Sequence, residues 1–114
     1  MREVLVISSD RELAEALKMK LQGEGFLVSF SESLESSFLE VGRREPFMAI
    51  VDGESIPEPL WQARNFLNWL HHRSPVVLLT DRYCEELSPV CDSYLPRLSG
   101  KNEILSCIQS LSPH

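Results

Sequence analysis

Val4-Leu5-Val6-Ile7-Ser8-Ser9-Asp10 is the stretch that decides the fold of this chain. Its four aliphatic residues show no alternation with polar ones, which is typical of a strand buried on both faces of a parallel sheet. The polar corner at positions 8 to 10 leads directly into a segment with helical periodicity. In such sheets the carboxyl ends of the strands form the crevice where ligands bind. We therefore expect positions 8 to 10 to face the functional site.

The rest of the chain repeats this strand-then-helix pattern. After a first strand at 3–7, further strands are expected at Phe26–Phe30, Phe47–Val51, Val76–Thr80 and Ser93–Leu95. The helices between and after them are expected from position 11, from 31 or 33 to about 42, at 60–72 and from 99 onward. Such alternation predicts an α/β fold, a three-layer sandwich. Its five-stranded parallel sheet should have the order 2-1-3-4-5, with helices on both faces.

Capping residues are expected at three of these helices. Asp10 or Ser9 should cap the first helix, Ser31 or Ser33 the second, and Ser99 the last, because a side-chain oxygen there accepts the free amide protons of the first turn. Between Asp81 and Cys91 there is room for one short helix at most, since Pro89 opposes a longer one.

Length and composition indicate an ordinary globular domain. The 114 residues, 43% hydrophobic and 25% charged, suffice for one domain spanning 1–114. A net charge of -6 argues against nucleic-acid binding through this domain. No apolar run reaches membrane-spanning length and no signal peptide is apparent, so we expect a cytoplasmic protein. The three cysteines lack the paired spacing of a zinc site, His71 and His72 have no third ligand, and no metal is expected.

Three later segments fall where the strands should end. They are Ile50-Val51-Asp52, Leu78-Leu79-Thr80 and Asp92-Ser93-Tyr94-Leu95-Pro96-Arg97. Together with the opening strand and its corner, they make the whole chain resemble the receiver domain of bacterial response regulators, the CheY-like members of the flavodoxin-like fold. The resemblance implies a role in two-component signal transduction or a phosphorelay.

The resemblance also implies a role for each strand-end residue. Asp52 takes the position of the aspartate that accepts a phosphoryl group from a histidine kinase. Thr80 takes that of the hydroxyl that binds the new phosphate, and Tyr94 that of the switch aromatic. Arg97 stands where the family has a lysine. Read without the resemblance, Thr80 is a strand-end hydroxyl with a local backbone bond, and Tyr94 an aromatic packed at the edge of the sheet.

The departures from the family pattern concern the metal. The acidic pair that holds magnesium in the family falls on Ser8 and Ser9. Magnesium prefers charged oxygen ligands, and phosphoryl transfer needs it to neutralise charge on the transferring group. We therefore expect weak or absent Mg²⁺ binding, no other cofactor, and no phosphorylation of Asp52 by the usual route. Asp52 should instead form an ion pair with Arg97, or accept a hydrogen bond from Ser8 or Ser9.

The segment before the fifth strand is about six residues shorter than in a typical receiver, or about 9 Å of helix. The fourth helix should be shortened or missing, leaving the sheet poorly covered there. The helix at 60–72 lies beside this gap, with Leu60, Ala63, Leu67 and Leu70 as its core stripe. Either Phe66 and Trp69 fill the space, or they form with Trp61 an exposed patch for a partner or a second copy.

The sequence thus predicts a pseudo-receiver: a non-enzymatic domain that acts by phosphorylation-independent protein–protein interaction in bacterial signalling. One alternative is a working receiver that uses Asp52 with a non-standard metal site. Another is a small nucleotide- or flavin-binding module, although the corner at positions 8 to 10 lacks the glycines of a phosphate-binding loop. The sequence leaves open the partner, the pathway, the oligomeric state, and whether a longer regulator continues beyond His114.

Overall fold

A computed structural model describes residues 2–37 and 46–111. Its strands are β1 (Glu3–Ile7), β2 (Leu27–Ser31), β3 (Met48–Asp52), β4 (Val76–Leu79) and β5 (Ser93–Leu95). The α-helices are α1 (Arg11–Gln22), α3 (Leu60–His71) and α4 (Lys101–Leu111), and two short 3₁₀ helices are η1 (Gly53–Ser55) and η2 (Glu85–Val90). All strand pairs are parallel and follow the order β2-β1-β3-β4-β5, as the sequence predicts.

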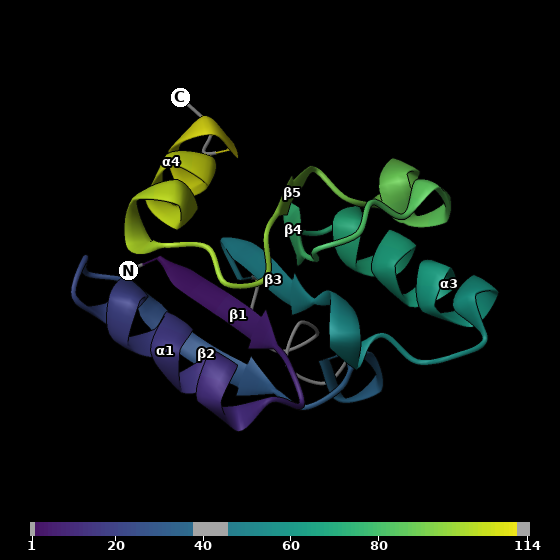
Figure 1. Ribbon diagram of the computed structural model, residues 1–114, viewed down its shortest axis with the longest axis horizontal. Coiled ribbons are helices and arrows are strands. Elements are labelled where there is room, and N and C mark those ends of the chain that lie inside the picture. The colour runs from purple at the N-terminus through teal and green to yellow at the C-terminus, as the bar shows by residue number, and fades with distance from the viewer. Residues whose placement is uncertain (1, 38–45, 112–114) are drawn as a thin grey trace.

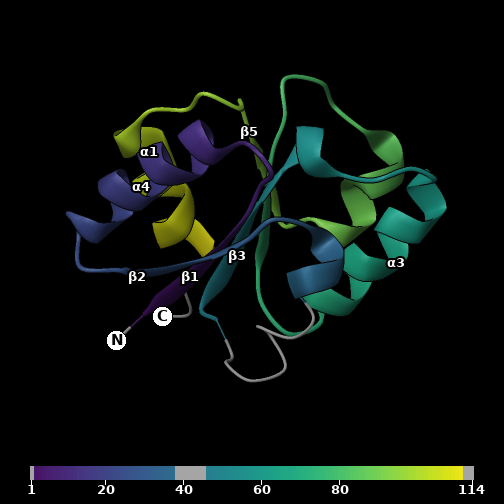
Figure 2. The same ribbon diagram turned by 90° about the horizontal axis from the view of Figure 1, so that it is seen from below.

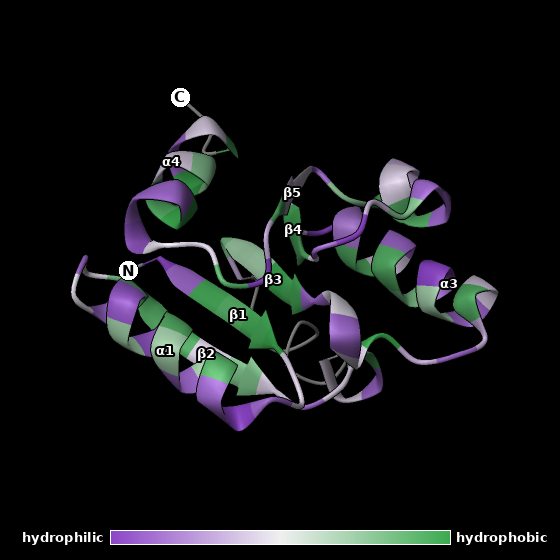
Figure 3. Cartoon of the chain, viewed as in Figure 1, coloured by the Kyte–Doolittle hydropathy of each residue, from purple (hydrophilic) through white to green (hydrophobic). Residues whose placement is uncertain are grey.

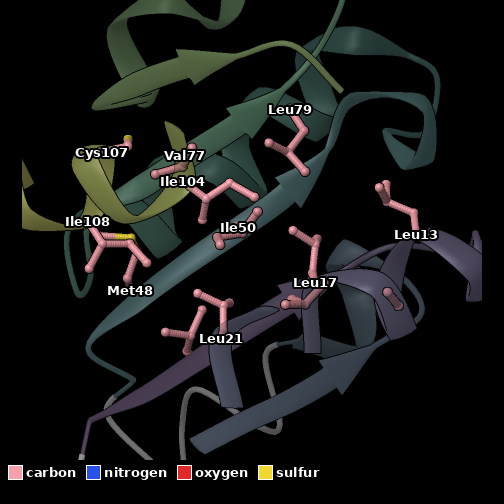
Figure 4. Close-up of a cluster of buried hydrophobic side chains, with 13 residues drawn as sticks. Leu13, Leu17, Leu21, Met48, Ile50, Val77, Leu79, Ile104, Cys107 and Ile108 are labelled. Atoms are coloured by element: carbon pink, nitrogen blue, oxygen red, sulfur yellow. The ribbon is translucent and has the colours of Figure 1, made fainter. Parts of the chain in front are cut away.

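The sheet separates two layers of helices. Figure 2 shows α1 and α4 on one face and α3 with η2 on the other. The apolar run of β1 explains this arrangement, because successive strand residues point to opposite faces. Val4 and Val6 pack in the core beneath α1 and α4, whereas Leu5 and Ile7 pack in the core beneath α3 and η2. Figure 4 shows the first of these cores, in which apolar side chains of α1, β3 and α4 meet: Leu13, Leu17, Leu21, Ile50 and Ile104. In Figure 3 the central strands have the green colour of hydrophobic residues. Within the described residues, no helix is long and apolar enough to cross a membrane.

Several element boundaries differ from the predicted ones by one residue. β2 and β3 begin and end one residue later than expected, and β4 and α3 end one residue earlier. Ser31 therefore closes β2, while the Ser33 hydroxyl accepts from the Ser36 amide at the start of the next helix. The predicted end of that helix, near position 42, lies outside the described residues.

The cap of α4 was predicted wrongly. The Ser99 hydroxyl donates to the carbonyl of Pro96 at 2.7 Å instead of capping the helix. Gly100 occupies the position before α4, and its amide donates to Glu103 Oε1 at 3.1 Å. This is the backward half of a capping box, which satisfies the cap amide with a side chain from the first turn.

The short 3₁₀ helix η2 replaces the fourth helix, and it corrects the expectation of a poorly covered sheet. Leu87 and Val90 of η2 are buried in the core beneath α3. Pro89 lies within η2 and prevents a longer α-helical run. One short element with two apolar anchors therefore covers β4 and β5 where a full helix is absent.

Candidate functional site

The predicted site lies at the carboxyl edge of the sheet, toward which the arrowheads in Figure 1 point. Ser8 follows β1, Asp52 ends β3, Thr80 follows β4 and Arg97 follows β5. Parallel strands bring these four chain positions to one edge. Asp52 is buried there, with only 1% of its surface exposed.

Arg97 forms a two-pronged ion pair with Asp52. Its Nε lies 2.8 Å from Asp52 Oδ1, and a terminal nitrogen lies 3.1 Å from Asp52 Oδ2. A planar guanidinium matches both oxygens of a carboxylate, which a lysine ammonium cannot do. The predicted Asp52–Arg97 ion pair is therefore confirmed, and it takes the bidentate form.

Three more donors complete the shell around Asp52. The Ser8 hydroxyl donates to Oδ2 at 2.7 Å, so the two arrangements predicted as alternatives both occur. The Glu54 amide donates to Oδ1 at 3.1 Å and the Ser55 hydroxyl to Oδ2 at 3.3 Å. With five donors on two oxygens, the carboxylate has no lone pair left for another ligand.

Asp10 is a second carboxylate bound to the same arginine. Its Oδ1 accepts from the amides of Glu12 and Leu13 and so caps α1, as predicted. Its Oδ2 accepts from Arg97 at 2.7 Å, which the sequence analysis missed. One guanidinium therefore joins the loop after β1 to the end of β3.

The ionisation of both carboxylates follows from this network. Burial raises the pKa of Asp52, but the hydrogen bonds from Arg97 and Ser8 outweigh it, and the pKa lies below its ordinary value. The hydrogen bond from Arg97 also lowers the pKa of Asp10. The two carboxylates in turn raise the pKa of Arg97. The corner is thus a charged cluster at neutral pH, in which one guanidinium binds Asp10 and Asp52 and has the exposed Glu54 carboxylate 3.6 Å from its Nε.

The backbone around the cluster is tightly fitted. The Arg97 amide donates to Asp81 Oδ1 at 3.1 Å, which fixes the start of the loop after β5. Gly53 follows Asp52, and a Cβ atom there would lie 2.8 Å from the Leu79 carbonyl oxygen and 3.1 Å from Thr80 Cβ. Only glycine allows this close approach of η1 to the end of β4.

Thr80 and Tyr94 do not join the cluster. The Thr80 hydroxyl donates to the Arg82 carbonyl at 2.8 Å and accepts from the Arg82 amide at 3.1 Å, which is the local bonding considered from the sequence. The Tyr94 ring packs against Tyr83, with centroids 5.5 Å apart. Its hydroxyl is buried, and this burial raises its pKa.

Ser9 is the other position where the family has an acidic residue. Its amide donates to the Ser55 hydroxyl at 2.8 Å, and the two hydroxyls lie 3.1 Å apart. Ser9 therefore links the loop after β1 to η1, and its hydrogen-bond partner Ser55 is the residue that donates to Asp52. Nothing in the sequence marked Ser55, at the end of η1, as a member of this cluster.

The donor set does not fit the magnesium ion that the receiver-like fold implies. Magnesium needs several free oxygen ligands in near-octahedral geometry, with carboxylates among them. Here the oxygens of Asp52 are fully engaged, one oxygen of Asp10 accepts from Arg97, and a positive guanidinium lies between the two carboxylates. Among the residues that the structure describes, no group of three or more His, Cys, Asp or Glu side chains could hold a metal ion.

The three aromatic residues of α3 lie in different environments. Phe66 and Trp69 are partly buried against the core that contains Leu87 and Val90 of η2. Trp61 is 67% exposed. The packing favours the interpretation that Phe66 and Trp69 fill the space left by the short fourth helix, with Trp61 as the exposed aromatic of this helix. Whether Trp61 contacts a partner stays a prediction.

No protein-family model and no curated protein matches the sequence. Solved structures do match the fold. The chain is similar to the chemotaxis protein CheY4 of Vibrio cholerae, with a TM-score of 0.81 and 16% identity over 97% of this chain and 98% of that one. It is similar to the response regulator TrrA of Thermotoga maritima in complex with Mg²⁺ and BeF, with a TM-score of 0.80 and 20% identity over 97% and 99%. It is also similar to a CheY-like receiver domain from Methylobacillus flagellatus, with a TM-score of 0.81 and 17% identity over 98% of this chain and 99% of that one. The chain therefore has the fold of CheY-like receiver domains.

Proposed function

We propose that this chain is a pseudo-receiver that acts in bacterial signal transduction by phosphorylation-independent protein–protein interaction, with no catalysis of its own. The observation that carries the proposal is the bidentate hydrogen bonding of Arg97 to Asp52 at 2.8 and 3.1 Å. The carboxylate that would accept a phosphoryl group is already neutralised by a cation of the chain itself.

Phosphorylation of Asp52 would require this ion pair to open. The attacking carboxylate oxygen would have to lose Arg97 or Ser8 from its shell, and a metal would have to enter beside a guanidinium. Opening a buried ion pair by withdrawing one partner costs about 3–5 kcal/mol. Because the ion pair stabilises the unphosphorylated state, this cost adds to the free-energy barrier of the transfer and also disfavours metal binding.

The cluster also supports a constant output surface. A receiver switches because phosphate and metal contacts favour one of two conformations. Here Arg97 already joins the loops that follow β1, β3 and β5 through Asp10 and Asp52. A surface that is held in one state suits a partner that binds constitutively.

A working receiver remains the second candidate, because Asp52 lies buried at the end of β3 with Thr80 at the end of the neighbouring strand. A nucleotide- or flavin-binding module has less support. A cavity of about 300 Å³ lies beside Ser8 and Ser9, and its charged lining residues are Arg11, Glu15 and Glu32. The two carboxylates outnumber the one cation, which disfavours a phosphate there.

The test is an amide NMR titration with magnesium and then with beryllofluoride, which mimics an acyl phosphate. The proposal predicts that the amides of Ser9, Asp52 and Thr80 respond no more in the wild-type chain than in Asp52→Asn. Saturable shifts at these amides that spread to Tyr94 and disappear in Asp52→Asn would overturn it and support the working receiver. A coloured or nucleotide-loaded preparation would support the third candidate instead.

A further inference from the structure

We propose that the outer edge of β2 pairs with β2 of a second copy of this chain, as two antiparallel strands of a symmetric dimer. This inference is independent of the state of Asp52. β2 lies at one end of the sheet, and β1 is the one strand that hydrogen-bonds to it within the described residues. An edge of this kind presents backbone donors and acceptors to any strand that can reach it.

The hydrogen bonds to β1 identify which residues of β2 face outward. The Leu27 amide donates to the Arg2 carbonyl, and the Ser31 carbonyl accepts from the Ser8 amide. The N–H and C=O of one strand residue point to the same side, and successive residues alternate. Positions 27, 29 and 31 therefore face β1, while Val28 and Phe30 direct their amides and carbonyls to the open edge.

This arrangement is complementary to itself. In a two-fold antiparallel pair centred on Ser29, Val28 of one copy lies opposite Phe30 of the other, and each such pair exchanges two hydrogen bonds. The same register places Leu27 opposite Ser31. No charged residue of β2 faces another charge, because the strand Leu27–Ser31 contains none.

β2 also lacks the features that protect edge strands from pairing, namely charges, proline and very short length. The other edge strand is protected by its length and by a proline: β5 has only three residues and is followed by Pro96. Of the large apolar side chains that the structure shows as exposed, two belong to β2, Leu27 at 49% and Phe30 at 37%. Pairing would cover both, which is why we assign this edge a second copy.

The experiment measures amide hydrogen exchange by NMR and sedimentation of the purified chain from low micromolar to millimolar concentration. We expect the Val28 and Phe30 amides to become protected as the concentration rises. The Leu27, Ser29 and Ser31 amides face β1 and serve as internal controls, which should be protected at every concentration.

Phe30→Lys tests the same edge, and Trp61→Lys on α3 is the matched control. A lysine at position 30 should raise the dimer dissociation constant at least about tenfold, because the two-fold symmetry places the Val28–Phe30 pair in the interface twice. Trp61→Lys should leave the dimer constant unchanged, and circular dichroism checks that both variants fold. The proposal is overturned if the wild-type chain stays monomeric at millimolar concentration, if Phe30→Lys dimerises like the wild type, or if Trp61→Lys dissociates the dimer.

Discussion

Replacing Arg97 with alanine would leave Asp52 buried without its counter-ion. The Asp52 side chain is 1% exposed and that of Arg97 is 16% exposed, so water cannot readily take the place of the guanidinium. The hydrogen bonds from Ser8, Ser55 and the Glu54 amide would remain. Asp52 would thus lose its two charged donors and keep its three neutral ones.

The magnitude follows from the burial. Removing one partner of a buried ion pair costs about 3–5 kcal/mol, and the remaining neutral donors favour the lower end, about 3 kcal/mol. The free energy of unfolding of a domain of this size is about 6–17 kcal/mol, at about 0.05–0.15 kcal/mol per residue. Arg97→Ala should therefore remove between a fifth and a half of the stability.

The loss should depend on pH. In the wild-type chain the pKa of Asp52 lies below its ordinary value, so the stabilisation is complete above about pH 4 and disappears as the pH falls through the folded pKa. In Arg97→Ala the pKa of Asp52 should be higher than in the wild type, because the strongest hydrogen bond that lowers it is gone while burial still raises it. The difference between the two proteins should therefore be largest at neutral pH and shrink as Asp52 becomes protonated.

Urea unfolding followed by tryptophan fluorescence measures this difference. At an m-value of about 1.5 kcal/mol/M, a loss of about 3 kcal/mol lowers the midpoint by about 2 M. Arg64→Ala, which removes an exposed arginine of α3, is the matched control and should shift the midpoint little. In a double-mutant cycle, Asp52→Asn should make Arg97→Ala much less costly. A loss below about 0.5 kcal/mol, or an equal loss at pH 3 and pH 7, would refute the reasoning.

Three further predictions concern the same corner. Asp10→Ala removes both the cap of α1 and a contact of Arg97, and should lower the urea midpoint more than Asp10→Asn, which keeps a capping oxygen. Gly53→Ala should lower the free energy of unfolding by about 1–3 kcal/mol, because the new Cβ would lie 2.8 Å from the Leu79 carbonyl oxygen. Thermal unfolding measures the loss, and an unchanged melting temperature would contradict the close approach. Arg97→Ala should bind Mn²⁺ or Mg²⁺ more tightly than the wild type, because the guanidinium that competes for Asp10 and Asp52 is gone. Titration calorimetry measures the affinity, and adding Asp10→Asn to this variant should weaken the metal binding again.

The fold could be predicted because its signals are local. The uninterrupted run Val4–Ile7 indicates a strand that is covered on both faces, and the alternation of such runs with helical stripes leaves few topologies. The shifts of one residue in β2 and β3 have a physical cause as well. The last residue of a strand is set by where hydrogen bonding to the neighbouring strand stops, and a run of apolar residues does not show that position.

The pairing of Asp52 with Arg97 could also be predicted from the sequence, because parallel strands deliver their ends to one edge. The hydrogen bond from Ser8 to Asp52 was likewise predicted, as the alternative to the ion pair. The remaining contacts of the cluster could not be predicted. Asp10 has a local explanation as a cap, and its second oxygen reaches Arg97 only through the path of the loop after β5. Ser55 and the Glu54 amide join through the turn of η1, and loop backbone of this kind is set by contacts distant in the sequence.

The amino-acid sequence by itself thus determined the order of the strands, the position of Asp52 at the carboxyl edge of the sheet, and the presence of Ser8 and Ser9 at the corner after the first strand, since each follows from local pattern and strand direction. The tertiary structure alone decided that one guanidinium binds both Asp10 and Asp52 and that η2 closes the sheet beside α3. It also chose, between the two roles considered for Thr80, the local bond to Arg82. The reason is that side-chain partners depend on distances across loops, and those distances exist only once the whole chain has folded.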